Sequence, residues 1–389
     1  MHSKTHIALL TTLSSLAWTA IGYGQAKKPP GKAGPDVVYL PEFTVTDDNN
    51  NSYAASESVT GSRVATKIID LPFTVNVVTS EFMNDFDFFD ISDAMAYTSS
   101  LTGLDTQGNY NLRGFGATFY LRNGFYRLGL VDRVNIDRIE VIKGPNAAIY
   151  GQTSPAGMVN MITKKPRAEP YQRLSVTGGS NDLWRAELNV DSNLGSVGGV
   201  QFYNLASAAA TNRGYDVPYA YLKQRLFSDA VMAKIDDRSS LLFEFEWSKR
   251  SSTPNTAGVP FVYSKKKYTG EIVPELGRLS QGGPNATKNR EMSTATLTYE
   301  NRISDVWTAR ASTYGYHRHA FNFNSGSSSK YDPSSNTIGR AKSYWDVLNE
   351  DSAALQADLL AHYWTGNHTL EHKTLLTLDL SDNWRYRIQ

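Results

Sequence analysis

The chain has 389 residues, of which 40% are hydrophobic and 20% charged, so it is long enough for two or three domains and its composition does not favour disorder. Its 39 Lys and Arg residues nearly balance its 38 Asp and Glu residues, which leaves no net field to attract nucleic acid or another polyanion. Cysteine is absent, which excludes disulfides, thiolate metal sites and cysteine nucleophiles.

The first 26 residues have the features of an export signal. Lys4 gives a weakly positive start, residues 7–20 are mostly apolar, and Gly24, Gln25 and Ala26 offer a cleavage site of mostly small residues. A transmembrane helix is the alternative, but the apolar run is too short for a bilayer core of about 30 Å. No later segment has the roughly 18 consecutive apolar residues of a spanning helix, so we expect that membrane insertion would require a barrel.

A tether is predicted over residues 27–59. Residues 27–36 are rich in Lys, Pro and Gly, and residues 47–52 form a polar run. Between them, residues 37–46 (VVYLPEFTVT) form a short apolar segment, typical of a strand that pairs with the sheet edge of another protein. The alternative is the first strand of the next domain.

Strands and helices mix in residues 60–169. Residues 73–78 and 138–143 alternate as strands, and residues 80–97 resemble one or two helices that begin at Ser80 and Ser92. Asn123 and Gly124 predict a hairpin, because both tolerate the positive φ of a type I′ turn. The pattern indicates a small α+β domain.

Long alternating segments replace this mixture after Pro170, with one apolar face and one mostly polar face. About nine strands of the length that a tilted membrane strand needs are predicted. They lie at residues 171–178, 184–191, 200–209, 221–235, 241–248, 293–301, 306–317, 353–364 and 369–380.

The connections between these strands differ in length on the two sides of the sheet. Residues 210–220, 251–292 and 318–352 form long loops on one side, where only the connection at 179–183 is short, and all connections on the other side are short. This asymmetry is typical of outer-membrane barrels. A soluble β-sandwich is the alternative, but it would not predict one-sided long loops or strands of this length.

Three strings in the middle of the chain resemble the plug of TonB-dependent outer-membrane receptors. They are NLRGFG at residues 111–116, RNG at residues 122–124 and the run VDRVNIDRIEVIKGPNAAIYGQTSPAGMVNMITKKP at residues 131–166. The similarity covers about residues 37–170, and within the family it is greatest to ferric-siderophore receptors. It implies an α+β plug domain followed by an antiparallel transmembrane β-barrel.

The resemblance divides the chain into a signal peptide (1–26), a periplasmic tether with the TonB box (27–59), a plug domain (60–169) and a partial barrel (170–389). Family barrels close with about 22 strands, so about nine strands lead us to expect an incomplete barrel and a truncated chain.

Two groups of site residues follow from the resemblance. The TonB box is assigned to Glu42, Phe43, Thr44, Val45 and Thr46. The plug motif comprises Arg113, Gly114, Arg122, Gly124, Glu140, Lys143, Gly144, Pro145, Tyr150, Gly151, Gly157 and Asn160.

Physical roles can be given to several of the motif residues. Gly144 and Pro145 would form a fixed turn, Gly151 and Gly157 would permit close backbone approach, and Tyr150 would supply a packing surface. The charged residues Arg113, Arg138, Glu140 and Lys143 could form ion pairs that are buried or face the barrel wall. Ordinary surface ion pairs are the alternative.

The function implied by the resemblance is energised import of a scarce ligand, a ferric siderophore, across the outer membrane. The implied partners are a periplasmic TonB-type transducer and outer-membrane lipid; we expect a monomer with no cofactor, metal site, catalytic residue or enzymatic activity. The alternatives are import of cobalamin or an oligosaccharide, or a non-transporting plug protein that signals or is secreted as a binding protein. Tyr263 and Tyr268 are aromatic candidates for ligand contact, and His317 and His319 share a strand face without a third metal ligand.

Overall fold

The computed structural model describes residues 53–60, 62–103, 108–117, 119–129, 132–144, 154–253, 261–265, 267–277, 283–325, 330–339, 343–366 and 369–388. All of them belong to one compact unit, Leu40–Gln389. The predicted export signal, the predicted TonB box from Glu42 to Thr46 and the motif residues Pro145, Tyr150 and Gly151 lie outside the described residues.

A five-stranded sheet forms the centre of the N-terminal α+β region, in the order β3-β9-β10-β7-β8. All neighbours are antiparallel except β10 and β7, which are parallel. The strands are β3 (Thr74–Thr79), β7 (Phe119–Arg122), β8 (Phe125–Leu128), β9 (Ile136–Lys143) and β10 (Gly157–Thr163). We call this region the plug.

Short elements surround the plug sheet. They are β1 (Glu57–Ser58) paired with β2 (Thr66–Lys67), the sheet of β4 (Leu101–Thr102), β5 (Tyr110–Leu112) and β6 (Phe115–Ala117), and the single-turn helices η1 (Ile68–Asp70) and η2 (Arg133–Asn135). The predicted helical segment is two helices, α1 (Ser80–Asp85) and α2 (Ile91–Met95). Their N-caps are Thr79 and Asp90, whose side chains accept backbone N–H bonds, so each helix begins one residue after its cap.

The plug sheet depends on two sharp backbone features. Asn123 and Gly124 have φ of 50° and 89°, as the type I′ hairpin between β7 and β8 requires, so the predicted hairpin is confirmed. Gly157 has φ of 132°, and a Cβ there would lie 1.9 Å from the carbonyl oxygen of Ile142. Only glycine allows β10 to approach β9 so closely.

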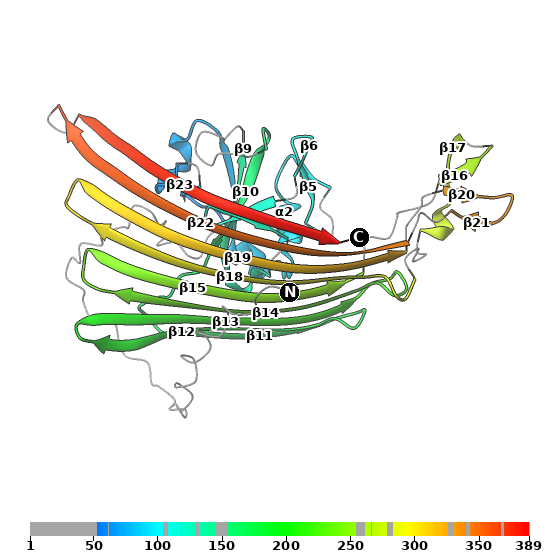
Figure 1. The fold of residues 1–389 in the computed structure, drawn as a ribbon, viewed down its shortest axis with the longest axis horizontal. Helices are drawn as coiled ribbons and strands as arrows, with labels where there is room; N and C mark the ends of the chain where they lie inside the picture. Colours follow the sequence, from blue (N-terminus) through cyan, green and yellow to red (C-terminus); the bar gives the residue numbers. More distant parts are fainter. Residues whose placement is uncertain are drawn as a thin grey trace, which may run out of the picture. The chain divides into compact units, whose positions relative to one another are not determined.

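The long alternating segments form one antiparallel sheet of nine strands, which we call the wall, in the order β11-β12-β13-β14-β15-β18-β19-β22-β23 (Figure 1). Its strands are β11 (Tyr171–Gly178), β12 (Trp184–Val197), β13 (Val200–Gly214), β14 (Tyr221–Lys234), β15 (Ser239–Ser252), β18 (Thr287–Arg302), β19 (Trp307–Ser325), β22 (Ser343–Thr365) and β23 (Leu370–Ile388). All nine predicted strands are present, and most are longer than predicted. The extra length holds both polar residues and large apolar ones, such as Phe321 of β19 and Trp384 of β23.

The predicted loops 251–292 and 318–352 are therefore too long, and the prediction missed the structure within them. They contribute a separate four-stranded sheet, β17-β16-β20-β21, and the single-turn helix η3 (Pro274–Leu276) (Figure 1). The strands are β16 (Phe261–Ser264), β17 (Lys267–Ile272), β20 (Lys330–Asp332) and β21 (Thr337–Ile338). β16 and β20 pair in parallel, which ties the two loops together.

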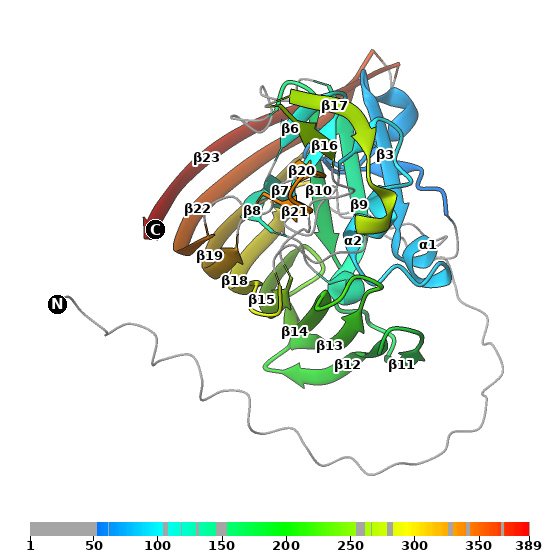
Figure 2. The same cartoon turned by 90° about the vertical axis from the view of Figure 1, so that its right-hand side faces the viewer.

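The plug lies against one face of the wall (Figures 1 and 2). Side chains of β15 show the alternation: Glu244 and Glu246 are buried toward the plug, and Phe245 and Trp247 point to the opposite face. No helix among the described residues is long and apolar enough to cross a membrane.

Candidate functional site

The contact between plug and wall is built from buried charges, and Glu246 of β15 is the centre of the first cluster. This carboxylate is 1% exposed. It accepts hydrogen bonds from Arg127 of β8 at 2.5 Å and from Asn135 of η2 at 2.6 Å, and it forms an ion pair with Arg122 of β7 at 3.4 Å. One wall carboxylate therefore holds three plug side chains.

A second carboxylate on the same strand completes this cluster. Glu244 accepts hydrogen bonds from the Thr163 hydroxyl at 2.5 Å and from the Asn123 amide at 3.3 Å and 3.4 Å. The two carboxylates of β15 match the two guanidinium groups of β7 and β8 in number, so the buried charges balance. Balance is essential because an unpaired charge away from water is strongly destabilising.

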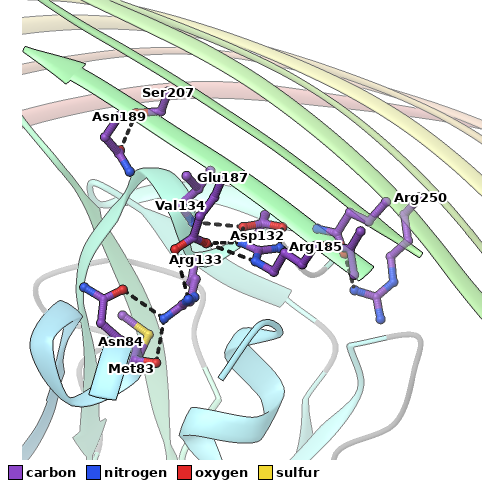
Figure 3. A network of polar contacts seen from close by, with 12 residues as sticks. Met83, Asn84, Asp132, Arg133, Val134, Arg185, Glu187, Asn189, Ser207 and Arg250 are labelled. Atoms are coloured by element: carbon purple, nitrogen blue, oxygen red, sulfur yellow. Dashed lines mark hydrogen bonds and ion pairs between the residues drawn. The ribbon is translucent and has the colours of Figure 1, made fainter. Parts of the chain in front are cut away.

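The second cluster joins β12 of the wall to η2 of the plug (Figure 3). Arg185 donates two bonds to Asp132, each 2.7 Å, and a third to Glu187 at 2.6 Å. Arg133 donates to Glu187 at 3.0 Å and to the carbonyl oxygen of Met83 at 2.7 Å. Burial lowers the pKa of Arg133, with Glu187 acting in the opposite direction. Two cations and two carboxylates again balance.

Beside this cluster, α2 and the wall enclose a cavity of about 360 Å³. An ion pair of 2.7 Å between Asp90 and Arg250 spans the two parts, and Asp93, Arg213 and Tyr215 also line the cavity. Burial raises the pKa of Asp93, with the charge of Asp90 adding to the effect. Charged side chains share the lining with apolar ones such as Phe89 and Leu222, and the charges suit the cavity to water or a polar solute.

The segment before the plug sheet is held by hydrogen bonds at Ser58 and at Thr60. Glu140, fully buried in β9, accepts hydrogen bonds from the Ser58 hydroxyl at 2.5 Å and from the Thr60 backbone N–H at 3.0 Å. The Asn160 amide donates to the Thr60 hydroxyl at 2.9 Å.

Three residues after Thr60, the same segment reaches the wall. The guanidinium of Arg63 lies 2.5 Å from Asp379 of β23 and 3.8 Å from Asp358 of β22. Arg63 has φ of 63°, which is an uncommon conformation for a residue other than glycine. The ion pairs of its side chain therefore come with a strained backbone at this position.

Of the four charged residues that the sequence singled out, two form a buried ion pair. Arg138 and Glu140 lie 3.2 Å apart inside the plug. Arg113 and Lys143 do not follow the prediction: Arg113 is exposed, and the Lys143 ammonium donates to the Ser99 hydroxyl at 2.6 Å. Neither forms an ion pair with a described residue.

The charges that join plug and wall are mostly ones that the sequence did not single out. They are Arg63, Asp90, Arg127, Asp132, Arg133, Arg185, Glu187, Glu244, Glu246, Arg250, Asp358 and Asp379. Their signal was the charged residues at alternate positions of the strands, which also fits a solvent-exposed face. Arg122 of the predicted motif does lie in this contact, whereas Asn160 bonds to Thr60 in the segment before the plug sheet.

The remaining candidates lie away from the plug. His317 and His319 are exposed and bond to Asp351 and Asn349, both at 2.7 Å. Within the described part of the chain, no group of three or more His, Asp and Glu side chains could hold a metal ion. Tyr263 and Tyr268 pack edge to face in the sheet formed by the loops, with ring centroids 5.1 Å apart.

The architecture, a plug held by balanced charges against a wall of long antiparallel strands, defines an outer-membrane receptor fold. The TonB-dependent Receptor Plug Domain family matches residues 67–158. The chain is 28% identical over 350 residues to the metal-pseudopaline receptor CntO of Pseudomonas aeruginosa, covering 84% of this chain and 46% of that protein.

Two further comparisons point to the same class of outer-membrane receptor. The ferrichrome outer membrane transporter/phage receptor of Escherichia coli is 26% identical, with 66% of this chain and 36% of that protein covered. The solved structure of the pyoverdine receptor FpvA of Pseudomonas aeruginosa superposes with a TM-score of 0.79 at 20% identity, covering 90% of this chain and 52% of that one, which supports the fold.

Residues 67–158 thus match the plug domain of the TonB-dependent receptors, and the chain, like the relatives named above, is located in the outer membrane. It spans about half the length of the curated relatives it matches, 46% in the case of CntO. The relatives named above are receptors and transporters rather than enzymes.

Proposed function

We propose that the chain acts in TonB-energised import of a ferric siderophore or a similar metal chelate across the outer membrane. The names of the relatives support this ligand class, since they include receptors for metal-pseudopaline, ferrichrome and ferripyoverdine. We keep the domain division proposed from the sequence. It gives a tether up to residue 59, a plug over residues 60–169 and wall strands from residue 170. We propose no catalytic activity for any of them.

The observation that carries the proposal is the way in which the plug is held. Its contact with the wall contains balanced ion pairs and hydrogen bonds, such as those of Glu246 and Arg185, and separate small apolar groups, such as Val134 with Ala209 and Leu226, rather than one continuous apolar core. Polar contacts of this kind can exchange for water when a plug is displaced, whereas an exposed apolar core would resist displacement. A plug that must both close a pore and move suits such a contact.

Force would enter through the segment before the plug. The proposed TonB box, Glu42 to Thr46, precedes the anchored residues Ser58 and Thr60 by fewer than twenty positions. A TonB-type transducer that adds its strand to this box would pull on the hydrogen bonds of Glu140 and Asn160 first. The remaining motif residues, among them Gly144 and Gly157, would stabilise the plug sheet until the transducer pulls on it.

Cysteine crosslinking gives a direct test, because the chain has no cysteine of its own. Val45→Cys should crosslink to a cysteine in the periplasmic domain of the transducer, and more strongly when ferric siderophore is present outside. Gly31→Cys, in the tether but outside the box, is the matched control and should crosslink weakly. Equal crosslinking at both positions would contradict the box assignment.

Transport itself is measured as uptake of radioactive iron with a siderophore. Val45→Pro removes a backbone N–H from the proposed strand pairing and should abolish energised uptake while leaving ligand binding at the cell surface. Val45→Ala is the control that keeps the N–H. Normal uptake by the Pro variant would overturn the proposal.

A further inference from the structure

The outward face of the wall carries three neighbouring cations on two adjacent strands. Lys223 and Arg225 of β14 and Lys249 of β15 are all exposed on the face that does not contact the plug. We call these residues the cation patch. They lie near the ends of β14 and β15 that join the long connections.

Two of the cations oppose each other directly. Arg225 and Lys249 are register partners in the antiparallel pair of β14 and β15. Directly opposed side chains in such a pair have Cβ atoms about 4.5–5.5 Å apart, and like charges at that separation are destabilising. Lys223 lies two residues along the same face, about 7 Å away. A sheet that places three cations so close together is suited to an anion between them.

Acidic neighbours do not neutralise the patch. Lys249 lies 3.3 Å from Glu291 of β18, which also accepts a bond from the Trp247 indole at 3.0 Å. None of the described residues forms an ion pair with Lys223 or Arg225. Three positive charges therefore face one carboxylate.

Cations at the opposite end of the wall behave differently. Lys234, Arg302 and Lys373 lie beside the short turns, and each has an acidic partner within 3.3 Å. Those partners are Asp237, Asp305 and Glu371. Among the described residues, two of the three patch cations, Lys223 and Arg225, thus lack the acidic partners that these three turn-end cations have, and the Lys223 ammonium lies over the ring of Tyr221 at 5.8 Å from its centroid.

Directly below the patch, the same outward face becomes aromatic and apolar. Phe227 and Trp247 are register partners and follow Arg225 and Lys249 by one step on the outward face. Phe245 and Phe243 continue the apolar face along β15. Long loops mark the external side of an outer-membrane barrel, and aromatic residues mark the edge of its apolar band. The patch therefore lies at the level of the lipid headgroups of the outer leaflet.

We propose that Lys223, Arg225 and Lys249 bind the phosphate groups of phosphorylated glycolipid in the outer leaflet. The lipid phosphate would lie over Arg225 and Lys249, with Lys223 beside it and the acyl chains against Phe227 and Trp247. Charge complementarity and continuity with the apolar face favour a membrane lipid over a soluble anion. The proposal rests on the outer-membrane location and is independent of the imported ligand.

The test uses the full chain, purified in uncharged detergent and titrated with diphosphoryl lipid A, with bound lipid counted by native mass spectrometry. Lys223→Gln/Arg225→Gln should weaken binding by about thirtyfold, from about 1 kcal/mol for each basic residue near an anionic surface. Arg225→Lys keeps the charge and should bind within about threefold of the parent chain. Lys234→Gln/Arg302→Gln, at the turn end, is the matched control and should bind like the parent.

Two further probes distinguish the sources of phosphate. Dephosphorylated lipid A should bind weakly to the parent chain, and inorganic phosphate at the concentration of the lipid should not displace it. Equal binding of dephosphorylated lipid would reduce the site to acyl-chain contact and overturn the proposal. Displacement by inorganic phosphate would assign the patch to a soluble anion, and equal loss in the turn-end control would make the effect one of overall charge. Either result also overturns it.

Discussion

Replacement of Glu246 by Gln should release the plug from the wall. The substitution keeps the shape of the side chain but removes the charge that pairs with Arg122 and Arg127, which are 2% and 0% exposed. Removal of one partner of a buried ion pair costs about 3–5 kcal/mol, because the other charge stays buried and unpaired. With about 1.4 kcal/mol for each tenfold change, the population with a displaced plug should rise about 100-fold to 4,000-fold.

A single cysteine can report this displacement. Val134 of η2 is 2% exposed and packs against Ala209 and Leu226 of the wall, so Val134→Cys is protected from a thiol reagent while the plug is seated. In this background Glu246→Gln should raise the labelling rate by the factor given above. The added substitution Arg127→Gln should recover part of the loss, because it removes one of the unpaired charges.

The control is Glu291→Gln on the outward face of β18, where the carboxylate is 46% exposed and pairs with Lys249. An exposed pair contributes about 1 kcal/mol or less, so labelling should change less than about fivefold. If Glu246→Gln behaves like this control, the buried ion pairs do not hold the plug and the reasoning is refuted.

Three other substitutions test separate parts of the structure. Gly157→Ala places a Cβ 1.9 Å from the Ile142 carbonyl oxygen and should abolish the protease-resistant plug, whereas Gly198→Ala, with no atom within 4 Å, should cost about 1 kcal/mol; equal resistance of both variants would contradict the close approach. Glu140→Leu removes the acceptor of the Thr60 N–H and should speed hydrogen exchange of that amide about tenfold to a hundredfold, and unchanged exchange would show that this bond does not anchor the segment. Burial lowers the pKa of Lys164 from 10.5 to about 8, so between these values the unfolded chain binds more protons and the free energy of unfolding should rise with pH. Lys164→Gln should lose that rise in urea titrations at pH 8 and pH 10, and an unchanged slope would exclude Lys164 as its source.

Local chemistry explains why much of the fold could be predicted. The hairpin at Asn123 and Gly124 depends only on which residues tolerate positive φ, and the wall strands depend on a period of two residues that the membrane imposes on one face. The sheet of β16, β17, β20 and β21 was missed because it pairs two loops about 70 residues apart, and neither loop has a strand pattern of its own. The continuation of β23 was also missed, although Trp384, Tyr386 and Ile388 alternate there with Arg385 and Arg387, so its period of two residues was a signal that the prediction did not use.

Residues close together in the chain were enough to predict an α+β plug followed by long antiparallel strands, the presence of the nine wall strands and the alternation of their side chains between the two faces. The tertiary structure alone decided which charges meet. Arg63 and Asp379 are separated by 316 positions and Arg127 and Glu246 by 119. Their pairing depends on the register of every strand between them and on how the plug is seated. A charged residue at an inward position fits a solvated face and a buried ion pair equally well, and only the packed fold distinguishes the two.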